Sequence, residues 1–322
     1  MGRRLAVLAV LIGASLGGYF AWSGLSTPPE EDPNDPRETK YWPVSSAAVP
    51  VITGVDLLQR ELVGTFAVAP LQPFVAAFPW QPLEYVAAKD GFPFENLLQA
   101  NPLRFLEMCA ERFDQDVQGY TCIFVKKERI EGKLYPPGKT DYEVIKVACR
   151  EQPFSVFFDW QKHRKLASRA LYVQGENKDK ILARGAGVLA ALGIQQRALN
   201  DADAKRSGRY LMSEFGMGLA IKRTVKAMQA ARARGELHVR YEGQVKLDEL
   251  DGRVCYKFVR TPYRPVEEDG LNELTLYIDC ENWLQVGSIL RDPEGRLIAE
   301  YFFRDVEINP TFPENQFTRA AL

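Results

Sequence analysis

Residues 153–165 read PFSVFFDWQKHRK, and this stretch decides the class of fold. Large apolar side chains recur at every second position from Phe154 to Trp160, a period of two that is typical of a strand with one buried face. The face is bulky, because it carries two Phe, one Val and one Trp. Such a face packs either against the protein's own core or against a ligand that comes and goes.

Further segments of strand character follow one another between residues 120 and 308, joined by turn sequences such as ELDG and DPEG. A helix is predicted over 102–118, because Asn101 suits the N-cap and Pro102 the first helical position. One or two further helices are predicted, over 187–205 and, more strongly, over 216–235. About nine or ten strands with these few helices indicate one α+β domain built on a single large antiparallel sheet.

The first 23 residues have the pattern of an export signal. Two arginines precede an uncharged apolar run over 5–22, which as a helix would extend about 27 Å. We expect a cleaved signal peptide or an uncleaved membrane anchor, with the chain from residue 24 onward in the periplasm or secreted. Residues 24–100 are predicted to be a Pro-rich tether and irregular strap, and residues 101–322 the folded domain.

Several classes of function are disfavoured by composition and motifs. Lys plus Arg number 41 and Asp plus Glu 42, which argues against a nucleic-acid partner. His163 and His238 are the two histidines, and neither has a partner at metal-ligand spacing. The stretch GAGVLA at 185–190 matches a dinucleotide fingerprint but lacks the βαβ context that the fingerprint requires. We therefore expect no catalytic centre, no metal and no cofactor.

The five cysteines leave two readings open. In an oxidising compartment they could form up to two disulfides, with Cys255 and Cys280 on neighbouring strands. They could equally be five small buried side chains.

The predicted strands also carry bulky side chains that we expect to share the concave face of the sheet. Helices fill that face, or a cavity remains there for a ligand. The expected lining residues are Phe124, Phe154, Val156, Phe158, Trp160, Tyr172, Tyr256, Phe258, Tyr277, Tyr301 and Phe303.

The C-terminal third runs strand, Asp-led turn, strand in LYIDCENWLQVGSIL (276–290), then turn, long strand, Asn and closing Phe over 292–317. This layout resembles the LolA/LolB-like superfamily of bacterial lipoprotein carriers. Three stretches, GYTCIFVKKERIEGKL (119–134), KVACREQPFSVFFDW (146–160) and ALYVQGENKDKILARGAG (170–187), resemble more specifically the bacterial domain-of-unknown-function family 1571. RYLMSEFGMGLAIKR (209–223) is similar to that family's next helix start.

The resemblance implies a half-open β-barrel plugged by helices, with a hydrophobic cavity for a lipid or the acyl chain of a lipoprotein. The implied function is that of a non-enzymatic cell-envelope protein held at the membrane by its N-terminal segment. The alternative is an envelope sensor or scaffold that binds a protein partner through the barrel rim. An enzyme would require polar residues such as Glu128, Arg150 and His163 to converge inside the barrel.

Overall fold

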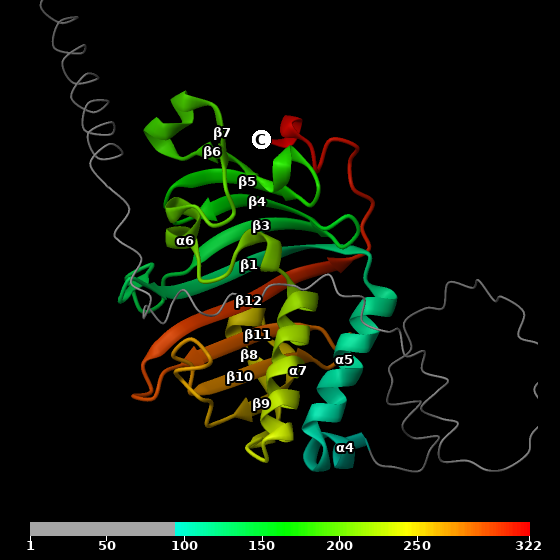
Figure 1. Cartoon of the computed structure of the whole chain (residues 1–322). Helices are drawn as coiled ribbons and strands as arrows, with labels where there is room; N and C mark the ends of the chain where they lie inside the picture. Colours follow the sequence, from blue (N-terminus) through cyan, green and yellow to red (C-terminus); the bar gives the residue numbers. More distant parts are fainter. Residues whose placement is uncertain (1–93) are drawn as a thin grey trace, which may run out of the picture. The chain divides into compact units, whose positions relative to one another are not determined.

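The computed structural model describes residues 94–322, shown in Figure 1. The predicted signal at 1–23 and most of the predicted tether lie outside these residues. The longer helices are α4 (Phe94–Ala100), α5 (Pro102–Asp116), α6 (Ala202–Ser207) and α7 (Met217–Ala233). Across residues 94–322 no helix has both the length and the apolar composition needed to cross a membrane.

Twelve strands form one antiparallel sheet. Its order is β7-β6-β5-β4-β3-β1-β12-β11-β10-β9-β8, and β2 pairs with β1 beside this path. The strands are β1 (Gly119–Ile130), β2 (Lys133–Tyr135), β3 (Glu143–Arg150), β4 (Ser155–Lys162), β5 (Ala167–Val173), β6 (Ile181–Gly185), β7 (Ile194–Arg197), β8 (Val239–Leu247), β9 (Arg253–Arg260), β10 (Glu273–Asp279), β11 (Gln285–Arg291) and β12 (Leu297–Ile308).

The centre of the sheet joins the first strand to the last one. In β1, Phe124 lies opposite Phe303 of β12 and opposite Ile145 of β3. Strands β7 and β8 are the two ends of the order, so the curved sheet is not closed. The predicted α+β class, with one large curved antiparallel sheet that stays open, is confirmed.

Helices α5 and α7 cover one face of the sheet and pack side by side (Figure 1). The start of α5 is as predicted, since Asn101 Oδ1 accepts a hydrogen bond from the Arg104 backbone N–H at 3.2 Å. The buried side of α5 includes Phe105 and Phe113, and that of α7 includes Ile221 and Met228. These helices supply the predicted plug.

The predicted helix over 187–205 is wrong. Residues 187–192 form a short 3₁₀ helix, β7 follows, and only α6 is α-helical. Gly193 has a φ of +67°, a left-handed conformation that ends the helical turn. Residues 194–197 then pair with β6 at the sheet edge, and this tertiary pairing overrides the local helical pattern.

The structure of residues 94–322 also bears on the predicted tether and on the cysteines. Helix α4 begins inside the segment predicted as a tether, with Leu98 fully buried. All five cysteines are free thiols, and four of them are buried.

Candidate functional site

Ten of the eleven predicted lining residues extend along the helix-bearing face of the sheet. Strand register places them there: Trp160 lies opposite Ile145, and Phe158 opposite Val147 and Ala170. Tyr172 lies opposite Val156, and its ring is 6.2 Å from that of Phe154, just before β4. The other members on this face are Phe124, Tyr256, Phe258, Tyr301 and Phe303.

Tyr277 is the exception and lies on the opposite face. Its neighbours Leu276 and Ile278 pair with Phe258 and Tyr256, so strand alternation turns Tyr277 the other way. There its ring is 6.4 Å from that of Phe302. The prediction failed because LYID is apolar at three consecutive positions, and such a run does not show which side chain faces the helices.

One group of these aromatic residues, the helix-covered patch, is Tyr256 and Phe258 on β9. Phe105 of α5 has its ring centroid 5.5 Å from Phe258 and 5.7 Å from Tyr256. Phe94 of α4 is also 5.7 Å from Tyr256. Side chains of the helices α4 and α5 therefore cover this patch.

The second group, the segment-covered patch, comprises Phe124, Phe158, Trp160, Tyr301 and Phe303. Phe215 caps it from above, with ring centroids 4.7 Å from Phe158, 5.1 Å from Phe124 and 5.9 Å from Phe303. The rings beneath are buried, whereas Phe215 itself is only partly buried.

Phe215 belongs to the cover segment, residues 198–216, which connects β7 to α7. This segment contains α6 and one 3₁₀ turn but no strand, so no sheet ladder holds it. It ends at Gly216, whose φ of +119° is strained for any residue with a side chain. A Cβ at Gly216 would also lie 2.6 Å from the Tyr120 hydroxyl.

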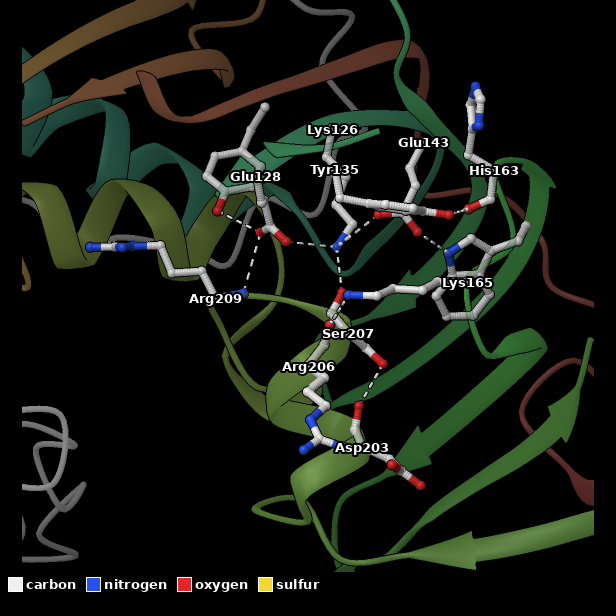
Figure 2. A network of polar contacts seen from close by, with 12 residues as sticks. Lys126, Glu128, Tyr135, Glu143, His163, Lys165, Asp203, Arg206, Ser207 and Arg209 are labelled. Carbon is white, nitrogen blue, oxygen red and sulfur yellow. Dashed lines mark hydrogen bonds and ion pairs between the residues drawn. The ribbon is translucent and has the colours of Figure 1, made fainter. Parts of the chain in front are cut away.

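Three buried charged residues beneath the cover segment form the polar latch: Lys126, Glu128 and Glu143 (Figure 2). The Lys126 ammonium lies 2.9 Å from Glu128 Oε2 and 3.4 Å from Glu143 Oε2. It also donates to the backbone carbonyl of Ser207 at 2.9 Å. This last bond ties the sheet to the cover segment.

Both carboxylates of the latch have further partners. Glu128 Oε1 accepts from the Tyr301 hydroxyl at 2.6 Å and from the Arg209 backbone N–H at 3.4 Å. Glu143 accepts from the indole N–H of Trp160 at 2.9 Å. The latch therefore holds two rings of the segment-covered patch in place and fastens the cover segment at Ser207 and Arg209.

The latch also shifts pKa values. Burial acts to lower the pKa of Lys126, but Glu128 and Glu143 outweigh it, and the pKa is raised. Burial raises the pKa of Glu143 above its usual range despite Lys126. Burial, then the charge of Glu128, raises the pKa of Tyr301 well above 10. Lys126 is thus a fixed ammonium at neutral pH, which makes it a fastening group and a poor nucleophile or base.

The structure does not bring Glu128, Arg150 and His163 together. Arg150 donates to Ser155 Oγ and lies over the Phe317 ring, away from the latch. His163 reaches the network only through its backbone carbonyl, which accepts from Tyr135 (Figure 2). Within residues 94–322 no group of His, Cys, Asp or Glu side chains could hold a metal ion.

Sequence reasoning missed Lys126, Glu143, Ser207 and Phe215. A signal existed for Lys126 and Glu128, since they continue the alternation of Phe124 on β1 and therefore face the core. No comparable signal marks Ser207 or Phe215, because the path of an irregular segment is set by tertiary contacts.

The family described as "Protein of unknown function (DUF1571)" matches residues 117–321. The chain belongs to this family. The match includes every strand of the sheet, the cover segment and α7. It confirms the family that the sequence motifs had indicated. A search among curated proteins finds no match.

Several solved structures are similar to this chain. MucB is 14% identical with a TM-score of 0.41, and the match covers 68% of this chain and 63% of MucB. MucB is also solved as a complex with MucA from Pseudomonas aeruginosa. The chain thus spans less than two thirds of MucB.

For two other similar structures, the match with this chain covers almost the whole of the other protein. The LolA superfamily protein NE2245 from Nitrosomonas europaea is 10% identical with a TM-score of 0.30, over 67% of this chain and 99% of that one. The lipoprotein LppX from Mycobacterium tuberculosis is 10% identical with a TM-score of 0.37, over 66% and 98%. Identities this low concern the fold alone.

Proposed function

We propose that this protein is a non-enzymatic cell-envelope protein that binds a lipid or the acyl chain of a lipoprotein on the segment-covered patch. One observation carries the proposal. Five buried aromatic residues lie beneath the cover segment, and the partly exposed Phe215 of that segment packs on three of them. A purely structural core would more simply be closed by a regular element, as α5 closes the patch on β9.

The proposed binding step is displacement of Phe215 and its neighbours from the aromatic rings. The polar contacts that oppose it include those of Lys126 and Glu128 with Ser207 and Arg209, the bond from Lys165 to the Arg206 carbonyl, and the ion pairs Arg206–Glu131 and Arg209–Asp269. Burying a 16-carbon chain would contribute about 10 kcal/mol gross, before the costs of ordering the chain and moving the segment. That gain exceeds the loss of these five contacts at about 1 kcal/mol each.

The proposed site of action is the bacterial envelope, with the domain in the periplasm or secreted and the N-terminal segment at the membrane. The proposed partners are a lipid or an acylated protein. An acyl chain needs no catalytic group for recognition, because apolar contact supplies the affinity.

The test is native mass spectrometry of the full chain after export, alone and after incubation with palmitate or an N-palmitoylated peptide. We expect a discrete adduct of lipid mass, and faster uptake by Phe215→Ala, because the capping ring is gone. Phe94→Ala serves as the matched control, since it removes a partly buried ring over the helix-covered patch.

If folded wild type and Phe215→Ala both stay free of adduct, lipid binding is rejected. The rim-binding sensor or scaffold then becomes the function to test.

A further inference from the structure

Arg260 is a buried arginine on the aromatic face that the fold does not fully use. It lies at the end of β9, on the same face as Phe258, and is 2% exposed. Its guanidinium stacks 3.4 Å from the Tyr263 ring centroid, and Nη2 is 3.4 Å from Glu268 Oε1. Its Nε and Nη1 are buried without a hydrogen-bond partner among the described residues. Buried N–H groups in this state are rare and costly.

Two other arginines lie beside this position. Arg209, in the cover segment, pairs with Asp269 at 2.6 Å, next to the Glu268 that pairs with Arg260. The Nε of Arg209 is also buried and without a partner in the part of the chain that is described. Arg223 of α7 places its guanidinium 3.9 Å from the ring centroid of Tyr210. Arg209 and Arg260 each pair with one carboxylate, Asp269 and Glu268, and Arg223 stacks on Tyr210 beside them.

Tyrosines connect this arginine group to the segment-covered patch. The Tyr210 ring is 6.0 Å from that of Tyr301, and the Tyr301 ring is 5.9 Å from that of Phe124. Tyr210 also interacts electrostatically with Arg209 and with Tyr263. A continuous series of side-chain contacts therefore runs from the buried apolar rings to the guanidinium groups of Arg209 and Arg260.

We propose that Arg260, supported by Arg209, binds the anionic head of an amphiphile, a carboxylate or a phosphate, whose acyl chain lies on the segment-covered patch. This inference rests on the proposed function and specifies its ligand class. A guanidinium offers paired donors that match both anions. The Arg260–Glu268 contact, at 3.4 Å, is longer than a strong charged hydrogen bond of about 2.7–2.9 Å, so an incoming anion can compete with Glu268.

The experiment compares amphiphiles of equal chain length on the full chain: dodecanoate, dodecyl phosphate and the uncharged dodecanol. Inorganic phosphate is the probe without a chain. We expect the two anionic amphiphiles to bind about tenfold more tightly than dodecanol, the effect of one hydrogen bond to a charged group. In Arg260→Met, the affinity for the two anionic amphiphiles should fall to that for dodecanol, and the affinity for dodecanol should stay unchanged. Arg240→Met, at an exposed position of β8, is the control and should change nothing.

The unfolding temperature of the Arg260→Met variant shows whether Arg260 serves binding or stabilises the fold. A buried arginine with unpaired N–H groups is expected to destabilise the fold, so Arg260→Met should unfold at the same or a higher temperature than wild type. Arg260→Lys should restore part of the preference for anions. If Arg260→Met does not fold, Arg209→Met takes its place, with the same expected loss of preference.

The outcomes distinguish this proposal from acyl binding itself. Equal affinity for dodecanoate and dodecanol in wild type would overturn the head-group site and leave acyl binding standing. Phosphate binding that depends on Arg260, with no amphiphile bound, would support the anion site and reject the acyl chain. No binding of any probe would reject both.

Discussion

The two aromatic patches on one face of the sheet differ in what covers them. Phe105 of α5, itself fully buried, closes the patch on β9. A partly exposed Phe215 in an irregular segment closes the patch on β1, β4 and β12. Within residues 94–322, the latch of Lys126, Glu128 and Glu143 lies beside this second patch. The proposed binding therefore concerns the second patch, and the following experiments test whether its cover is held less firmly than the helices over the first.

The largest expected effect is on the helix-covered patch. Phe105→Ala removes a fully buried ring that contacts four aromatic neighbours, so it should lower the free energy of unfolding by about 3–5 kcal/mol. Urea denaturation measures this loss. A loss near 1 kcal/mol would show that α5 packs on the sheet no more tightly than the cover segment does. The proposed difference between the two patches would then be wrong.

The second-largest effect is expected when the polar latch is broken. Lys126→Met leaves Glu128 and Glu143 buried without their ammonium, at an expected cost of about 3 kcal/mol or more. The cover segment should lose protection first, which hydrogen exchange followed by mass spectrometry can map to residues 198–216. The control is Lys146→Met, an exposed site on β3. Uniform loss of protection along the chain would show that the latch stabilises the whole domain rather than the cover.

The latch also has a pH dependence. The pKa of Tyr301 is raised by burial and by Glu128, so the folded state keeps the phenol proton longer than the unfolded state does. Its contribution is complete below the unfolded pKa of about 10 and is lost as the pH rises further. Tyr301→Phe should cost about 1.5–3 kcal/mol at neutral pH, the value of a hydrogen bond to a charged group.

The same variant should flatten the alkaline loss of stability, measured by urea denaturation between neutral pH and about pH 11. An unchanged alkaline slope in Tyr301→Phe would assign the loss to other buried phenols, such as Tyr120.

The smallest expected effect is on the cap itself. Phe215 is only partly buried, so Phe215→Ala should lower stability by about 1 kcal/mol, well below the cost at Phe105. Urea denaturation gives this value, and binding of a hydrophobic dye reports the newly exposed rings. A loss of several kcal/mol would make Phe215 a core residue and would argue against a movable cover.

Much of the fold could be read from local patterns. The period of two from Phe154 to Trp160 predicted a half-buried strand, and Asn101 with Pro102 marked the start of α5. Both signals are local, because side-chain alternation and capping depend on residues a few positions apart. The helix predicted over 187–205 failed since β6 offered hydrogen bonds that outweighed a weak helical preference.

The sequence by itself determined that this chain has one antiparallel sheet, a bulky aromatic face and the family it belongs to. Only the tertiary structure decided that Tyr277 turns away, that Lys126 meets Ser207 from 81 positions along the chain, and that Arg260 is buried with unpaired N–H groups. Periodicity reports which side chains are buried, whereas their neighbours depend on strand register and on the path of an irregular segment. Those are fixed by packing over long separations, which no local pattern encodes.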